Sequence, residues 1–126
     1  MPEKTSAETP AETASPSPSP TTTAYCLVQT ALASEAQAEA LAREIVQARL
    51  GACVQLQKIR SFYRWKNEAI SEPEFLLQIK TRSACYPALE AFIRAHHSYE
   101  TPEIVQLPIV AGSAEYLLWL DAQTGG

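Results

Sequence analysis

The sequence is short of the features that mark membrane, nucleotide-binding and disulfide-bonded proteins. It has no run of about 18 apolar residues, so no membrane span is expected. Its four glycines form no loop that could cradle a phosphate. The three cysteines, Cys26, Cys53 and Cys85, contain no C-x-x-C pair, which argues against a zinc ribbon and favours a reducing compartment. A net charge of −4 argues against broad nucleic-acid binding. We therefore expect a small cytoplasmic protein that binds neither membranes nor nucleic acids.

The first 24 residues differ in composition from the rest of the chain. They hold five of the nine prolines and have no aromatic or branched aliphatic side chain. Such a segment buries too little apolar surface to offset its ordering entropy, so residues 1–24 are predicted to be a disordered extension rich in Pro, Ser and Thr. They lack the apolar stretch of a secretory signal and the arginines of a transit peptide. Residues 25–126 are predicted to be one folded domain.

Hydrophobic periodicity predicts strands and helices in the order β-α-β-β-α-β-α. Ser34 is a candidate cap of the first helix, and Gly51 is expected to end it in a left-handed conformation. Pro108 places the last strand at an edge or at a bulge. Two β-α-β halves in this order form a split ferredoxin-like α+β sandwich with a short C-terminal helix. The strands are expected at residues 24–32, 52–66, 74–81 and 102–110, with a connector at 67–74. The helices are expected at 34–51, from Thr81 or Ser83 to residue 96, and at 112–122.

The second predicted strand is unusually long and has two different faces. Between residues 58 and 66, an apolar and aromatic set alternates with a set that is mostly basic, as a period of two requires in a strand. The basic set could attract an anion, or it could only discourage strand aggregation. The length suggests a bend or a pairing beyond the domain. The basic set comprises Lys58, Arg60, Phe62, Arg64 and Lys66, and the other set comprises Ile59, Ser61, Tyr63 and Trp65.

The segment HHSYETPEI, residues 96–104, is the strongest candidate for a functional site. Imidazole and carboxylate side chains suit zinc or copper, so His96, His97 and Glu103 are candidate ligands. Adjacent helical residues point about 100° apart, so one histidine could bind an ion while the other packs. The alternative is that a histidine at a helix C-terminus only interacts with the helix dipole. Cys85, at a helix start, is a weaker candidate for thiolate chemistry.

Taken together, the folded segments resemble the CutA family of divalent-cation-tolerance proteins. The matching stretches are GACVQLQKIRSFYRW, LLQIKTR and AFIRAHHSYETPEIVQLPIVAGSAEYLLWL. The resemblance implies a ferredoxin-like subunit in a homotrimer similar to PII signalling proteins. It also implies a part in tolerance of copper and other divalent ions, and copper binding in some members.

The resemblance also implies site residues. The paired histidines of the family correspond to His96 and His97, and a cysteine that some members place beside them is Gln29 here. A soft thiolate ligand for copper is therefore missing, and weak binding of copper or zinc is the expectation. A second set, around the cleft between subunits, suits either an interface or a small-molecule site. It comprises Tyr63, Trp65, Lys80, Tyr99, Glu100 and Trp119.

Two functional hypotheses follow from these residues and from the resemblance. The first is a non-enzymatic homotrimer linked to divalent metal tolerance through weak binding at His96, His97 and Glu103. The second is a PII-like signalling or scaffold trimer that binds a small molecule or a partner protein at the cleft between subunits.

Overall fold

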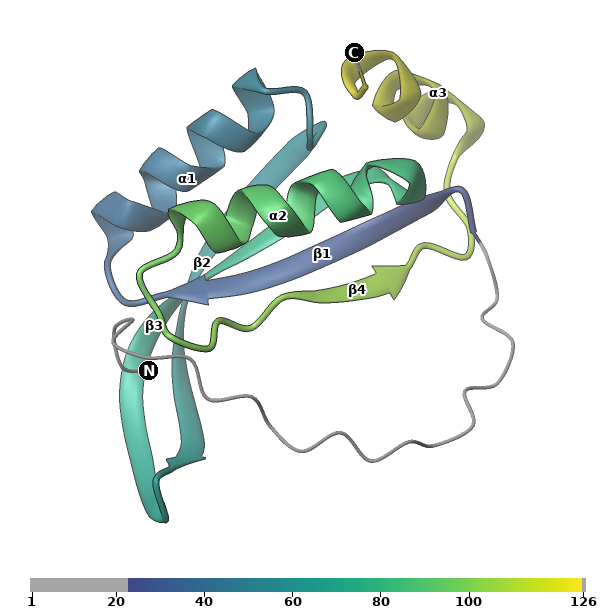
Figure 1. The fold of residues 1–126 in the computed structure, drawn as a ribbon. Coiled ribbons are helices and arrows are strands. Elements are labelled where there is room, and N and C mark those ends of the chain that lie inside the picture. Colours follow the sequence, from purple (N-terminus) through teal and green to yellow (C-terminus); the bar gives the residue numbers. More distant parts are fainter. Residues whose placement is uncertain (1–22, 126) are drawn as a thin grey trace.

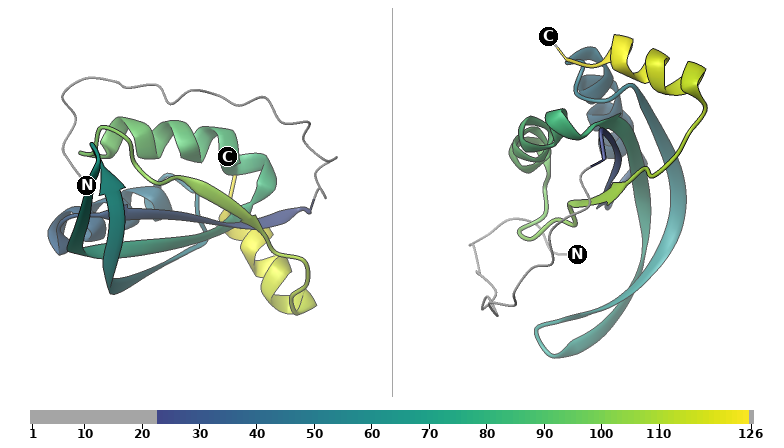
Figure 2. Two further views of the ribbon diagram at one scale, coloured as in Figure 1. Left: turned by 90° about the horizontal axis from the view of Figure 1, so that it is seen from below. Right: turned by 90° about the vertical axis from the view of Figure 1, so that its right-hand side faces the viewer.

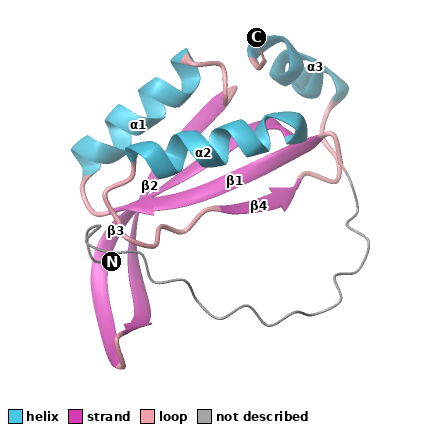
Figure 3. Cartoon of the chain, in the orientation of Figure 1, coloured by secondary structure: helices cyan, strands magenta, loops and turns pink. Residues whose placement is uncertain are grey.

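The computed structural model describes residues 23–125 and has the predicted ferredoxin-like α+β architecture (Figures 1 and 3). The predicted disordered extension lies outside the described residues except for Thr23 and Ala24. The sheet has the strand order β2-β3-β1-β4, and all neighbours are antiparallel. The elements are β1 (Tyr25–Leu32), α1 (Glu35–Gln47), β2 (Cys53–Trp65), β3 (Glu68–Arg82), a 3₁₀ turn (Ser83–Cys85), α2 (Tyr86–His96), β4 (Val105–Pro108) and α3 (Ala114–Gln123).

Helices α1 and α2 lie side by side on one face of the sheet, which we call the covered face (Figures 1 and 2). The hydrophobic core lies between these helices and the central strands β1 and β3. Alternate residues of each strand point into it, because the side-chain period of a strand is two. The core residues are Cys26, Val28, Leu32, Ala38, Leu41, Ile45, Leu77, Ile79, Leu89 and Ile93.

The opposite face of the sheet, which we call the open face, has no helix over its centre. A row of glutamines crosses it, since Gln55 pairs with Gln78 and Gln78 with Gln29. The Gln78 amide donates to the Gln29 side chain at 2.9 Å. Val105 and Leu107 of the edge strand β4 are exposed on this face.

Helix α3 is fastened to the rest of the domain by two arginines and a tyrosine. Arg49 donates to the carbonyl oxygens of Ala122 and Gly125, at 2.9 and 2.6 Å, and Arg82 donates to Thr124. The hydroxyl of Tyr25 donates to a carboxylate oxygen of Asp121 at 2.6 Å. The bond to Ala122 satisfies a carbonyl that the end of the helix leaves without a partner.

The helix caps follow the sequence, with one correction. Ser34 accepts a hydrogen bond from the Gln37 N–H, and Ser113 caps α3 in the same way. The prediction that Gly51 ends the first helix in a left-handed conformation is wrong: Arg49 holds the positive φ, at 61°. Gly51 is needed for space, because an added Cβ would lie 2.6 Å from Cγ2 of Ile79.

Two predicted boundaries also need correction. Residues 68–74 are not a connector but the first half of the 15-residue β3. A turn at Lys66 and Asn67 joins β3 to the end of β2. Both turn residues have positive φ, as a two-residue hairpin of type I′ requires. The last strand is only four residues long, and it lies at the sheet edge as Pro108 indicated.

Gly51→Ala should destabilise the domain by about 1–3 kcal/mol, since the new methyl group would press on the Ile79 and Ile45 side chains in the core. Urea unfolding followed by circular dichroism, at one protein concentration, measures the difference. Gly112→Ala is the matched control, because its Cβ would meet only the side chain of Leu117, at 3.1 Å or more. Equal stabilities of the two variants would contradict this account of Gly51.

Candidate functional site

His97 is buried and both of its ring nitrogens are engaged. Its side chain is only 3% exposed. Nε2 lies 2.8 Å from the carbonyl oxygen of Ala31, which can only accept, so Nε2 carries the proton. Nδ1 accepts from the backbone N–H of Tyr99 at 3.1 Å. The imidazole is therefore the neutral Nε2–H tautomer, and neither nitrogen has a lone pair free for an ion.

His96 has the opposite environment, at the surface between two helices. Its Nδ1 lies 2.8 Å from the carbonyl oxygen of Phe92 and donates to it, and its ring stacks on the Phe92 ring with centroids 4.1 Å apart. Its Nε2 lies 3.7 Å from a carboxylate oxygen of Glu44 in α1. The stacking and the bond to Phe92 hold the ring so that Nε2 is directed at the Glu44 carboxylate.

A groove of about 270 Å³ lies beside this pair, between α1 and the end of α2. Its polar groups include the Glu44 carboxylate, the His96 imidazole and the Gln37 amide, and Ser98 donates to Gln37 at 3.4 Å. Its apolar part comes from Ala40, Leu41 and Ala95. Carboxylate, imidazole and amide groups together suit a small cation better than an apolar ligand.

The predicted ligand set of His96, His97 and Glu103 does not form one site. Within residues 23–125, no three His, Cys, Asp or Glu side chains are arranged to hold a metal ion. Glu103 accepts from the Gln29 amide at 3.4 Å on the open face, whereas His96 lies against α1 on the covered face. Glu44 is the carboxylate near His96, and the sequence contained no signal for it because the two residues meet only through helix packing.

The predicted cleft residues fall into two groups. In the first group, Tyr99 is buried and donates to Glu74 at 2.8 Å, and Tyr63 donates to Glu72. Burial, and then the charge of Glu74, raise the pKa of the Tyr63 hydroxyl. Trp65 lies opposite Glu68 beside the hairpin turn, and Glu100 is half-buried.

The second group surrounds Lys80 at the other end of β3. The Lys80 ammonium lies 5.7 Å from the ring centroid of Tyr116, and that ring lies 5.5 Å from the ring of Trp119. Tyr63 pairs with Ile70 and Lys80 with Cys53 in the β2–β3 ladder. These positions are ten residues apart on β3, or about 33 Å. One chain therefore does not bring the two groups together.

The sequence missed Glu72 and Glu74, the carboxylates that hold the two tyrosines. Glu74 is only 5% exposed and pairs with Ile59 on the open face. Its pattern, E-P-E between turn residues, indicated a loop rather than a strand. The strand places these acids beside the tyrosines of the first group.

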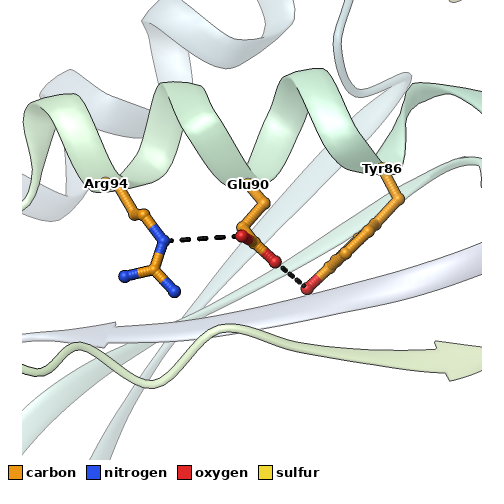
Figure 4. A network of polar contacts seen from close by, with 3 residues as sticks. All are labelled: Tyr86, Glu90 and Arg94. Carbon is orange, nitrogen blue, oxygen red and sulfur yellow. Dashed lines mark hydrogen bonds and ion pairs between the residues drawn. The ribbon is translucent and has the colours of Figure 1, made fainter. Parts of the chain in front are cut away.

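Two potentially reactive groups of the covered face, Tyr86 and Cys26, have raised pKa values. Tyr86, Glu90 and Arg94 form a line along α2, with Tyr86 donating to Glu90 at 2.8 Å (Figure 4). Burial, and then Glu90, raise the pKa of Tyr86 to about 12. Burial also raises the pKa of the Cys26 thiol. Neither group is prepared to act as a base or a nucleophile at neutral pH.

Comparison with known proteins identifies relatives over nearly the whole described domain. The family model described as CutA1 divalent ion tolerance protein matches residues 26–123. The "Divalent-cation tolerance protein CutA" of Thermus thermophilus is 43% identical over 93 residues, which cover 73% of this chain and 90% of the relative. The chloroplastic protein CutA of Arabidopsis thaliana is 44% identical over 67% of this chain, which spans only 47% of that relative.

None of the described helices is long and apolar enough to cross a membrane. The fold also matches solved structures. The structure of the "Periplasmic divalent cation tolerance protein CutA" from Archaeoglobus fulgidus aligns with a TM-score of 0.77 at 32% identity, covering 79% of this chain and 97% of that one. The chain therefore belongs to the CutA1 divalent ion tolerance protein family.

Proposed function

We propose that this protein acts in the tolerance of divalent metal ions without catalysing a reaction, and that it binds a divalent cation weakly between α1 and α2. The observation that carries the proposal is the orientation of His96 toward Glu44. This site keeps one of the predicted histidines and replaces His97 and Glu103 with Glu44.

The His96 imidazole has the surroundings of a metal ligand. Metal-binding histidines usually donate their second ring N–H to a carbonyl or a carboxylate, as Nδ1 of His96 does toward Phe92. Zinc ligands at about 2.0–2.1 Å in a tetrahedron lie about 3.3–3.4 Å from each other. Nε2 of His96 and the Glu44 oxygen are 3.7 Å apart, so a small movement would suit an ion.

The donors favour zinc over copper and weak binding over tight binding. One imidazole and one carboxylate leave the remaining positions to water. Soft thiolates select Cu(I), but Cys26 lies in the hydrophobic core away from the groove lining. Copper therefore stays the less favoured ion of the proposal.

We also propose that the protein assembles as a homotrimer of the PII type through the open face. The apolar side chains exposed there, Val105 and Leu107, would be buried by a second copy. Trp119 and Leu118 of α3 extend the exposed apolar surface. The three cysteines are free thiols, which fits the cytoplasm that we propose as its location.

A scaffold or signalling trimer is the second candidate function, and the distance between the two groups of cleft residues favours it. Tyr63 and Trp65 lie at one end of the sheet and Lys80 and Trp119 at the other. A neighbouring copy could place one group against the other, and the resulting cleft would hold a small molecule or a partner protein.

His96→Ala should lower the affinity for Zn²⁺ roughly tenfold or more, because it removes the one imidazole nitrogen with a free lone pair. Glu44→Gln should weaken binding in the same direction. Isothermal titration calorimetry with Zn²⁺ measures both, and we expect the unmodified protein to bind with a Kd on the order of 100 µM.

The control for the metal site is His97→Gln, which alters the neighbouring histidine. We expect its Zn²⁺ affinity to stay within about twofold of the unmodified protein while its melting temperature falls, since a buried hydrogen-bonded group is disturbed. Loss of Zn²⁺ binding in a folded His97→Gln variant, with binding retained in His96→Ala, would contradict the proposed site.

Val105→Glu should convert the trimer to smaller species, because a carboxylate would replace an apolar contact on the open face. Light scattering coupled to size-exclusion chromatography should show three times the 13.8 kDa chain mass for the unmodified protein. Val46→Glu is the matched control, since Val46 of α1 is 45% exposed and Val105 is 42% exposed. An unmodified protein that elutes as a monomer would refute the assembly.

A further inference from the structure

The long β2–β3 hairpin carries its charges on opposite faces. On the covered face, Lys58, Arg60 and Arg64 of β2 stand opposite Phe75, Pro73 and Ala69, none of which is charged. On the open face, Glu68, Glu72 and Glu74 of β3 stand opposite Trp65, Ser61 and Ile59. The far half of the hairpin, between residues 58 and 74, is therefore basic on one face and acidic on the other.

The basic face is free of helices and open to solvent. The two strands run on past α1 and α2 as a curved ribbon, so no helix covers their far half (Figures 1 and 2). Phe62, between Arg60 and Arg64, is 75% exposed. We call Lys58, Arg60, Arg64 and the turn residue Lys66, with Phe62 in their midst, the basic row.

The cations of the basic row have no carboxylate partners among the described residues. The ion pairs of residues 23–125 involve Arg94 and His96 instead. Arg60 donates to the hydroxyl of Ser71 at 2.9 Å, a neutral partner that leaves the charge uncompensated. The basic row is therefore a positively charged surface on a chain whose net charge is −4.

The spacing of the row fits an extended chain. Same-face side chains of a strand repeat about every 6.6–6.8 Å, so Lys58, Arg60 and Arg64 lie along a line with Phe62 at the missing position. An extended peptide with carboxylates at alternate positions repeats at the same distance. Opposite charges on neighbouring extended chains attract, and an apolar side chain in the middle would cover Phe62.

We propose that the basic row is a docking surface for an extended acidic segment of a partner protein, with carboxylates at alternate positions around a central apolar residue. This interaction is independent of the metal site between α1 and α2. It uses the covered face of the hairpin and leaves the open face to the contacts between copies.

A peptide fits the row better than a nucleic acid does. Tight binding to a nucleic acid requires many phosphates to be neutralised at once, and one hairpin offers only a few cations. The single aromatic ring of the row offers one stacking position, whereas strand-binding proteins use several.

The test is fluorescence anisotropy of the full chain with a labelled Glu-Thr-Glu-Thr-Leu-Thr-Glu-Thr-Glu peptide at low salt. The comparison peptide, Glu-Glu-Glu-Glu-Leu-Thr-Thr-Thr-Thr, has the same composition without the alternation. We expect the alternating peptide to bind more tightly, and added salt to weaken binding. The double variant Lys58→Glu, Arg64→Glu should lose roughly tenfold or more in affinity.

The control is the double variant Arg43→Glu, Arg94→Glu, which makes the same change of net charge on the helices. Its affinity for the peptide should change by less than about twofold, and the oligomer mass of both variants should match the unmodified protein. An equal loss in both variants would reduce the effect to net charge and overturn the proposal. So would equal binding of the two peptides, no binding of either, or tighter binding of an oligothymidylate of equal charge.

Discussion

The antiparallel register of β2 on β3 is the constraint on which the rest of the molecule depends. It runs from Cys53 opposite Lys80 to Trp65 opposite Glu68, and it is closed by a turn in which Lys66 and Asn67 both have positive φ. Such a turn matches the natural twist of the two strands. A slip of one residue would turn Leu77 and Ile79 out of the core. The same slip would bring the glutamates of β3 to the face that carries the cations of β2.

The two neighbouring histidines show how a helix end assigns different roles to identical side chains. His96 is the last residue of α2 and keeps the helical direction, which places it on the surface beside α1. His97 has an extended backbone, with φ −91° and ψ 140°, and its side chain enters the core against Ala31. The bond from the Tyr99 backbone to its Nδ1 then shapes the turn that leads to β4. One histidine is thus part of the fold, and the other lies at the surface beside Glu44.

Membership of the CutA1 family directs attention to metal ions, and the geometry of the chain limits what such binding can be. A single copy offers one imidazole and one carboxylate close together, so the site that we propose would hold an ion only loosely. The aromatic and charged residues expected at a cleft are held apart at the two ends of the sheet. Any site that unites them must therefore be built from more than one copy, whereas the proposed ion site and the basic row each use residues of one chain.

The sequence by itself determined the elements and the fold class, because these depend on local periodicity and on caps such as Ser34 and Ser113. It also indicated the family, the length of β2 and the two faces of its second half. It did not reveal that β3 runs on through Pro73 and Glu74. These residues are typical of a turn, but pairing with Arg60 and Ile59 of β2 keeps them in the strand. Only the tertiary structure decided that Glu44 lies near His96 and that the Ala31 carbonyl accepts a hydrogen bond from His97. It also decided that Gly51 is needed beside Ile79. Each of these contacts joins residues far apart in the chain, and their distance is set by packing rather than by any local pattern.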